Sequence, residues 1–326
     1  MRAAWYESNG SARDVLTVGD LPKPEPASGE VLVRMYVSGV NPSDVKSRAA
    51  RPLAGPRVVP HSDGAGVIEA VGDDVPSSRI GERVWLWNGQ WQRAMGTAAE
   101  FIALPAQQAV RLPDGVDFTA GACLGIPGLT AMHAVNLHDP VEGKTLLVTG
   151  AASAVGHYVT QIATARGARV IGTASAERAG HARSAGAFAT IDYKNEDVAR
   201  HVLDLTRGKG AEGIIDMDFS STAKMLSGGV LAPHGKLVGY GSNLRGDNTL
   251  PFSDILFKSL TLQFFLVYEL LPVERQAAVA ALSAMLEART LTHAIGAHFA
   301  LEDIAAAHET VEAGRIAGNT VIDLKN

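Results

Sequence analysis

The chain has a single cysteine, no long apolar run and no strong excess of charge of one sign. Cys123 alone excludes an intramolecular disulfide and a thiolate-rich metal cluster, and it fits a reducing cytoplasm. The N-terminus lacks the apolar stretch of a secretion signal, and no window of about 18 apolar residues is present to span a membrane. The net charge of −5 comes without a basic stripe. We therefore expect a soluble cytoplasmic protein with neither a nucleic-acid nor a membrane partner.

The 326 residues fall into two regions with different sequence patterns, and at this length two domains are expected. Residues 1 to about 120 are rich in Gly and Pro and carry short β-type runs such as "EVLVRMYVSGV", which predict a compact, mostly β unit. From about 122 to 266, apolar runs such as "TLLVTG" and "GKLVGYG" alternate with helical patterns. This alternation predicts a doubly wound α/β domain with a parallel sheet. The tail predicts two helices and a last strand in "NTVIDL", and it can return to the first unit.

The stretch "LLVTGAASAVGHYV" predicts a strand, a phosphate-binding turn and a helix. Such a turn directs free backbone N–H groups and the positive end of the helix at a pyrophosphate. Its usual pattern is G-x-G-x-x-G, yet Ala151 and Ser153 occupy the first two glycine positions, and only Gly156 keeps the third. We expect Ser153 either to hydrogen-bond a phosphate or to weaken its binding. The alternative is an ordinary strand-to-helix connection.

The second strand of this domain, "ARVIGTAS", favours NADPH over NADH. An Asp or Glu about 20 residues past the turn would bind the ribose 2′-hydroxyl of NAD. Here Thr173, Ala174 and Ser175 occupy that region, and Arg178 follows with a planar guanidinium that suits a 2′-phosphate. The alternative for Arg178 is a solvated arginine on a helix surface.

Taken together, these stretches resemble the medium-chain dehydrogenase/reductase superfamily, and most closely its zinc-independent quinone oxidoreductase branch, the zeta-crystallin-like proteins. The similarity spans nearly the whole chain and rests on "GVNPSDVKSR", "HSDGAGVIEAVGDDV", "GTAAEFIALP", "GACLGIPGLTA", "TLLVTGAASAVG" and "AHETVEAGRIAGNTVIDL". It implies an α/β protein with a GroES-like, mostly-β substrate domain over residues 1–122, completed by 267–326. A Rossmann domain over 123–266 and a nicotinamide in the cleft are implied as well.

The resemblance also implies that no zinc binds. Zinc-bearing relatives carry a cysteine, a histidine and a second cysteine at the positions of Asn41, Ser62 and Ile126. An amide, a hydroxyl and an alkyl group cannot form a tetrahedral site of thiolate and imidazole. Without a metal, hydride transfer to a quinone or enone needs mainly positioning, because the negative charge spreads over a conjugated acceptor.

The same resemblance assigns the site residues. Asn41 and Lys46 are the catalytic candidates, although Lys46 stands where several quinone reductases place a tyrosine. Lys46 either donates to the developing oxyanion or is an ordinary solvated lysine. Tyr193 is expected near the 2′-phosphate, with a half-buried aromatic as the alternative. The full set of expected NADPH contacts is Asn41, Thr130, Ser153, Ala154, Val155, Ser175, Arg178, Tyr193, Tyr240, Gly241, Ser242, Phe265 and Asn319.

The leading hypothesis is therefore an NADPH-dependent quinone reductase. Two alternatives stay open: a reductase of activated C=C bonds in an enone, enal or enoyl thioester, and a protein that binds NADPH without turnover. The departure at Lys46 favours the first of these slightly. The strand predicted in "LTLQFFLVY", at the edge of the Rossmann sheet, is long and apolar enough to pair with another chain. We expect a homodimer that continues the sheet across a two-fold axis.

Overall fold

The computed structural model describes residues 1–244 and 246–324, and these form two compact units. Unit 1 comprises Met1–Ile126 together with the chain from Ser283 onward, and unit 2 comprises Pro127–Leu282. The boundaries lie inside a π-helical turn, η3 (Leu124–Gly128), and inside the helix α10 (Pro272–Glu287). The limits given from the sequence, 122/123 and 266/267, stay predictions of domain extent.

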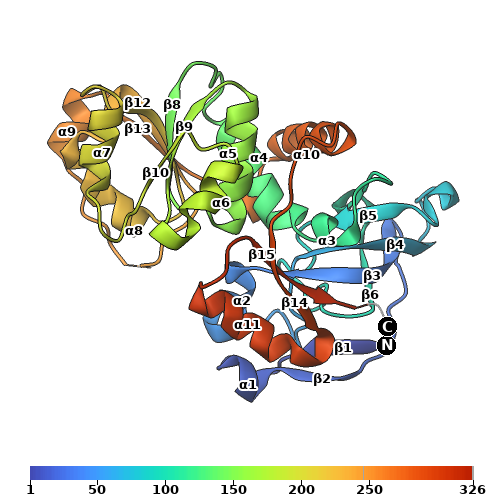
Figure 1. The fold of residues 1–326 in the computed structure, drawn as a ribbon. Coiled ribbons are helices and arrows are strands. Elements are labelled where there is room, and N and C mark those ends of the chain that lie inside the picture. The colour runs from blue at the N-terminus through green and yellow to red at the C-terminus, as the bar shows by residue number, and fades with distance from the viewer. Residues whose placement is uncertain (245, 325–326) are drawn as a thin grey trace. The chain divides into compact units, whose positions relative to one another are not determined.

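Unit 1 is built on a seven-stranded, mostly antiparallel sheet (Figure 1). Its last strand pairs antiparallel with the long third strand, with Val321 opposite Gly39, so the tail of the chain completes the sheet begun near the N-terminus. Alternate residues of the third strand, among them Val31 and Val33, are fully buried in the core. The sheet has the order β14 (Ile295–Ala300), β15 (Asn319–Asp323), β3 (Glu30–Val40), β4 (Asp63–Val71), β5 (Arg83–Leu86), β7 (Ala109–Arg111), and β6 (Phe101–Pro105) pairs with β3.

Short helices and a hairpin surround this sheet. Ile304 and Ala307 of the last helix are buried against Val40 and Ile322 of the sheet, which fixes that helix to the strands. The helix that follows β3 begins with Pro42 at its first position, where the missing N–H costs no hydrogen bond. The further elements of unit 1 are β1 (Arg2–Trp5), α1 (Ala12–Val15), β2 (Thr17–Asp20), α2 (Pro42–Ala50), η1 (Ser77–Arg79), η2 (Ala106–Gln108), α3 (Phe118–Gly121), η7 (Leu301–Asp303) and α11 (Ile304–Ala313).

Unit 2 contains a six-stranded sheet in which all the strands run parallel. Its central strands are apolar and buried on both faces, because the consecutive residues Leu146, Leu147 and Val148 of one strand are all fully buried. The strand order is that of a dinucleotide-binding doubly wound sheet, so the predicted fold class is confirmed. The order is β10 (Ala189–Ile191), β9 (Arg169–Thr173), β8 (Thr145–Val148), β11 (Ala211–Asp216), β12 (Leu231–Gly239), β13 (Thr261–Phe264).

Helices cover both faces of this sheet, with α5 and α6 on one side and α7 and α9 on the other (Figure 1). The helix α5 buries Val159 and Ile162 completely and ends before Gly167, whose φ of 84° breaks the helix. The helices and short turns are α4 (Leu129–Asn136), α5 (Ala154–Ala165), η4 (Ala176–Arg178), α6 (Ala179–Ser184), α7 (Val198–Leu205), α8 (Phe219–Thr222), η5 (Ala223–Gly228), α9 (Phe252–Phe257) and η6 (Val267–Glu269).

The strand predicted across "LTLQFFLVY" is much shorter in the structure, although it does lie at the edge of the sheet. Only Thr261–Phe264 pair with β12, because β12 itself ends at Gly239, opposite Phe264. Beyond that point the chain forms η6, which buries Val267 and Tyr268. Val267 and Tyr268, which continue the apolar run of the strand in the sequence, are therefore core residues of a turn. No helix within 1–244 or 246–324 is both long and apolar enough to cross a membrane.

Candidate functional site

The turn between β8 and α5 in unit 2 has the geometry of a dinucleotide-binding turn. Gly150 adopts a φ of 64°, and its N–H donates to the Thr173 hydroxyl at the end of the neighbouring strand (2.9 Å). Ser153 is the N-cap of α5, and its Oγ accepts the Gly156 N–H at 3.0 Å. The expectation for Ser153 is sharpened, because its oxygen serves the helix while its O–H proton is left to donate to an anion.

Glycine is required at position 156 but not at 151 or 153. A Cβ on Gly156 would lie 2.1 Å from the carbonyl oxygen of Gly150, so any side chain would push the helix off the strand. The N–H groups of Ala154 and Val155, in the first turn of α5, have no acceptor within the helix. A pyrophosphate fits such a turn, because these N–H groups and the helix dipole both attract an anion.

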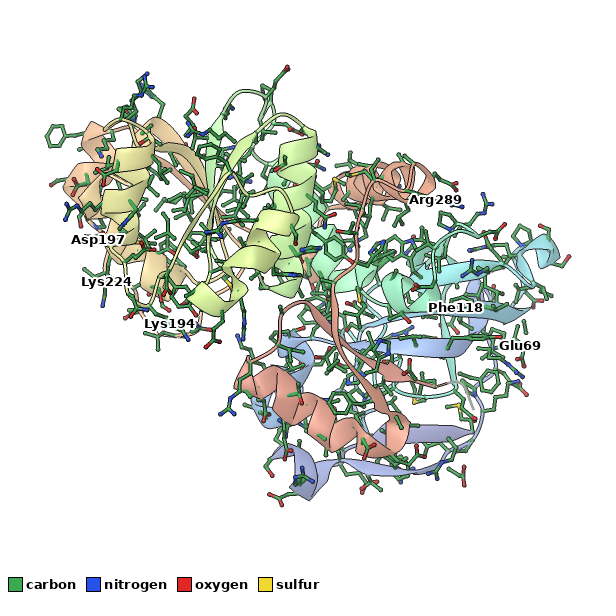
Figure 2. All side chains as sticks on the ribbon, viewed as in Figure 1. Glu69, Phe118, Lys194, Asp197, Lys224 and Arg289 are labelled. Carbon is green, nitrogen blue, oxygen red and sulfur yellow. The ribbon has the colours of Figure 1, made fainter. Side chains whose placement is uncertain are left out.

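The residues expected near the 2′-phosphate lie after two neighbouring parallel strands of unit 2. Ser175 and Arg178, both half-buried, follow β9, and Tyr193, which is 54% exposed, follows β10. Asp192 links the two turns, because its carboxylate accepts hydrogen bonds from Asn195 and from the Ala176 N–H, which lower its pKa. Lys194 and Asp197 mark the turn of Tyr193 in Figure 2.

Two of the nicotinamide-side residues expected in unit 2, Tyr240 and Phe265, lie close together. Tyr240 and Phe265 follow β12 and β13, with their ring centroids 6.3 Å apart. His133 meets the Phe265 ring edge-on at 4.7 Å, one helical turn beyond the buried Thr130 on α4. The backbone conformation that follows β12 is fixed at Gly241, where a Cβ would lie 2.5 Å from the Met217 carbonyl oxygen. Ser242 donates to the carbonyl of Leu244 (2.8 Å).

A buried acid at the end of β11 escaped the sequence reasoning. Asp216 is fully buried, and its Oδ1 accepts the hydroxyls of Thr149 (2.6 Å) and Thr222 (2.7 Å). Burial raises the pKa of Asp216. The Tyr240 hydroxyl points into the same interior, and burial together with Asp216 raises its pKa. Neither that hydroxyl nor Asp216 Oδ2 has a hydrogen-bond partner within the described ranges.

In unit 1, Asn41 lies between two buried carboxyl groups. It is the N-cap of α2; its Nδ2 donates to Asp63 Oδ2 (2.9 Å), and its backbone N–H donates to Asp44 Oδ2 (2.8 Å). The Ile126 N–H donates to the same Oδ2 of Asp63 (3.0 Å). Asp44 is 3% and Asp63 0% exposed. The N-cap-to-N3 spacing of Asn41 and Asp44 was the available signal for Asp44, whereas nothing local marked Asp63.

The three positions at which zinc-bearing relatives hold their metal meet around these carboxyl groups. The Asn41 side chain and the Ile126 N–H both donate hydrogen bonds to Asp63 Oδ2, and the Ser62 N–H donates a hydrogen bond to the Asp44 carboxyl. Burial raises the pKa of Asp44 to about 7, and burial with the neighbouring Asp44 raises the pKa of Asp63 well above its usual range. Among residues 1–244 and 246–324, no group of three or more His, Cys, Asp or Glu is arranged to hold a metal ion. The expectation that zinc does not bind stays a prediction that rests on the donor set.

A chain of buried hydrogen bonds runs from α11 to this cluster. Thr97 donates to the Asp63 carbonyl (2.5 Å), so Ser38 must donate to Thr97 (2.8 Å). The Nδ1–H of His61 then donates to Ser38 (2.9 Å). The remaining Nε2 of neutral His61 accepts from Nε2–H of His308 on α11 (2.9 Å). Counting donors in this way fixes the tautomers of both rings.

His61 and His308 were not predicted as a pair. Both rings are fully buried, and burial lowers the pKa of His61 well below its usual value. Burial, assisted by the nearby Arg48 charge, lowers the pKa of His308 to about 3. His61 also holds a φ of 76°, a left-handed conformation that costs a non-glycine residue about 1 kcal/mol or more. The strain places its ring against Ser38 and His308.

The two remaining candidates differ in exposure. Lys46 lies on α2 with its side chain exposed to solvent. Asn319 is buried at the start of β15, and its Nδ2 donates to the Ala294 carbonyl (3.0 Å), as does its backbone N–H (2.8 Å). The amide donors of Asn319 thus serve the junction of β14 with β15, and its Oδ1 is the group left for a ligand.

Two family models match the chain, one in each unit. The alcohol dehydrogenase GroES-like domain matches residues 27–114, and the zinc-binding dehydrogenase domain matches residues 154–287. A quinone oxidoreductase of Pseudomonas aeruginosa is 35% identical over 316 residues, which are 95% of each chain. Relatives therefore align along almost the entire sequence.

Solved structures agree with this relationship. A quinone oxidoreductase of Pseudomonas syringae superposes with a TM-score of 0.87 at 31% identity, covering 99% of both chains. A mycobacterial protein solved in complex with NADPH superposes with a TM-score of 0.88 at 29% identity, covering 99% of this chain and 100% of that one. The fold and the dinucleotide turn define a member of the medium-chain dehydrogenase/reductase superfamily. Within it, the chain belongs to the quinone oxidoreductase branch.

Proposed function

We propose that the protein is an NADPH-dependent quinone oxidoreductase that transfers a hydride to a quinone without zinc. The dinucleotide turn of unit 2 carries the proposal, because it offers free N–H groups to a pyrophosphate, while Ala174 and Ser175 in place of an acid come directly after β9 and Arg178 follows them. The relatives support the same activity, since they are named quinone oxidoreductases and one neighbour was solved with NADPH.

We assign the cofactor contacts as the family resemblance implies. The pyrophosphate binds at Ser153, Ala154 and Val155, where the first turn of α5 presents its N–H groups. The 2′-phosphate binds at Ser175, Arg178 and Tyr193. The nicotinamide end is assigned to Asn41, Thr130, Tyr240, Gly241, Ser242, Phe265 and Asn319.

The chemistry divides between the cofactor and the chain. When bound, NADPH supplies a hydride from C4 of its nicotinamide ring. The quinone gains that hydride and one proton, and the chain must orient the ring and exclude water from it. Lys46 is the candidate to donate a hydrogen bond to the developing oxyanion, because its ammonium is exposed to solvent and able to recharge with protons.

Steady-state kinetics with NADPH or NADH against quinones, enones and enals test this function. Arg178→Glu should raise the KM for NADPH about 10-fold to 100-fold, since a charge-assisted contact to the 2′-phosphate becomes a repulsion. The KM for NADH should change by less than about twofold, because NADH carries no 2′-phosphate. Arg200→Glu on α7, an exposed arginine of the same unit, is the charge-matched control and should leave both values unchanged.

Three results would change the assignment. Equal use of NADH and NADPH, together with no effect of Arg178→Glu, would refute the choice of cofactor. Reduction of enones or enals but no quinone would replace the proposed activity with C=C reduction. Tight binding of NADPH without turnover of any acceptor would make the protein a non-catalytic NADPH-binding protein.

We also propose a homodimer formed through the edge of the unit 2 sheet. The edge strand β13 exposes Phe264 (53%), and the preceding helix α9 exposes Phe252 (70%) and Phe257 (86%). Unpaired backbone beside exposed aromatic side chains favours pairing with a second copy across a two-fold axis. Light scattering should give twice the chain mass of 34.2 kDa, and a monomer at micromolar concentration would contradict the proposal.

The grouping with zeta-crystallin-like proteins and a cytoplasmic location complete the proposal. The grouping rests on the resemblance carried by the quoted motifs. The location rests on the single cysteine, Cys123, which is buried as a free thiol. Cell fractionation of the native protein tests the location, and recovery from an exported fraction would refute it.

A further inference from the structure

We propose that Asp63 is a positioning residue, which orients the side-chain amide of Asn41 toward the cofactor and does so as an uncharged hydrogen-bond acceptor. This inference rests on the proposed function, because it assigns Asn41 to the nicotinamide ribose. It extends that function by naming what holds Asn41 in place.

The hydrogen bonds of Asp63 determine which end of the Asn41 amide faces it. A backbone N–H can only donate, so the contact from Ile126 (3.0 Å) makes Oδ2 of Asp63 an acceptor. The amide group 2.9 Å from the same oxygen is therefore the NH₂ of Asn41. The Oδ1 of Asn41 then faces away from Asp63, where it accepts the Asp44 N–H in the capping box of α2, and its second lone pair remains to accept a ribose hydroxyl.

Asp44 holds the backbone of Asn41 in the same way. Its Oδ2 accepts the Asn41 N–H at 2.8 Å, and the Asp44 N–H returns to the Asn41 carbonyl at 3.0 Å. Asn41 is itself 4% exposed. Asp63 thus binds the side chain of Asn41, and Asp44 binds both its main chain and its side chain, which leaves the amide one orientation.

The surroundings of Asp63 disfavour a negative charge. Its side chain is fully buried, and its Oδ1 has no hydrogen-bond partner in the part of the chain that the structure describes. Gly125 packs against that oxygen so closely that a Cβ would lie 2.3 Å from it. Burial raises the pKa of Asp63, and the like charge of the nearby Asp44 carboxyl raises it further. A proton on Oδ1 leaves Oδ2 free to accept both bonds.

A double-mutant cycle tests whether Asp63 acts through Asn41. NADPH binding, followed by its fluorescence, and kcat/KM for NADPH with a quinone are measured for Asn41→Ala, Asp63→Ala and the double variant. Each single change should weaken binding and lower kcat/KM about tenfold, since one oriented hydrogen bond to the cofactor is lost. The double variant should be no worse than about tenfold, because the second change has nothing left to remove.

Asp63→Asn tests the charge. Its amide oxygen can accept both bonds in place of Oδ2, and its NH₂ replaces the protonated Oδ1, so binding and kcat/KM should stay within about twofold of the wild type. This variant keeps its volume and tests the proposal even if Asp63→Ala fails to fold. Asp117→Ala is the matched control: Asp117 caps α3 in the same unit through the Ala120 N–H (2.6 Å) and does not contact Asn41. Its effect should simply add to that of Asn41→Ala.

Each contrary result has a distinct meaning. Additive losses in the Asn41/Asp63 cycle would overturn the positioning role and leave the proposed function intact. A tenfold loss in Asp63→Asn would show that the charge is needed and overturn the uncharged acceptor. A wild-type protein that does not bind NADPH at all would overturn the proposed function and the positioning role with it.

Discussion

The dinucleotide turn of unit 2 and the carboxyl cluster of unit 1 are built in opposite ways. The turn uses backbone N–H groups from consecutive residues and tolerates Ala151 and Ser153 where glycine is usual. The cluster uses side chains from the start of α2 and from β4, together with one backbone N–H from η3, and its two acids are buried. A site built from backbone depends on space, whereas a site built from buried side chains depends on chemical identity.

The two regions also differ in their electrostatics. The first turn of α5 carries a partial positive charge and unsatisfied donors, so it attracts an anion without any charged residue. In unit 1, burial raises the pKa values of two acids and lowers those of two histidines, which disfavours the charged form of each group. The turn therefore favours a negative charge, whereas the buried cluster disfavours charge.

The largest expected effect concerns space in the turn. Gly156→Ala should destabilise the protein by about 3 kcal/mol and abolish NADPH binding, because its Cβ would lie 2.1 Å from the Gly150 oxygen. Gly180→Ala on α6 is the matched control, since nothing lies within 4 Å of its Cβ, and should stabilise by about 0.5 kcal/mol. Urea unfolding and NADPH titration measure both. A Gly156→Ala protein as stable as Gly180→Ala would show that the turn does not depend on space.

The next effect concerns the histidine pair. The folded pKa of His308, about 3, lies below the unfolded value of about 6.5, so the unfolded chain binds more protons between these values. The free energy of unfolding should therefore decrease as the pH falls from about 6.5 to about 3. His308→Gln keeps a donor to His61 but cannot titrate, and the wild type should lose about 1.4 kcal/mol per pH unit relative to this variant. Urea unfolding between pH 6 and pH 4 measures the difference.

For Asp44→Asn, we expect the stability difference from the wild type to change with pH in the opposite direction. The folded pKa of Asp44, about 7, lies above the ordinary value of 3.8, so the folded chain binds more protons between them. The wild type should gain stability relative to Asp44→Asn as the pH falls through this window. For the histidine pair, a stability difference between the wild type and His308→Gln that does not change with pH would show that His308 is not neutral in the folded protein.

The smallest effect concerns the helix cap in the turn. Ser153→Ala removes the bond to the Gly156 N–H and should cost about 1 kcal/mol of stability, whereas Ser153→Gly should cost a few tenths. Ser153→Gly should also bind NADPH more weakly than the wild type, because it loses the O–H that is left to donate to the pyrophosphate. Thermal unfolding and NADPH titration separate the two variants. Equal stability of all three proteins would mean that the cap contributes nothing.

The sequence predicted the elements of the molecule better than their extents. The alternation of apolar runs with helical patterns specified a parallel sheet, and the order of its strands confirms it. The run "LTLQFFLVY" misled because apolar residues of a buried turn and of a strand look the same without their partners. Only the end of β12 at Gly239 shows where pairing stops.

The candidate site shows the same limit. Ser153 and Gly156 could be recognised because they act within one turn, whereas the role of Arg178 stays a prediction from its place after a strand. Asp63, His61 and His308 gave no such signal. Each acts on residues far away in the chain, so its role depends on contacts that no local pattern records.

By itself, the sequence determined the division into two regions, the dinucleotide turn and the absence of an acid at positions 173 to 175, at the end of β9, because these follow from short-range periodicity and spacing. Tertiary structure alone decided that Asn41, Ser62 and Ile126 meet around two buried acids. It also decided that His61 takes a strained backbone to reach His308. The physical reason is desolvation: a carboxyl or imidazole changes its protonation and its role only when distant segments bury it together.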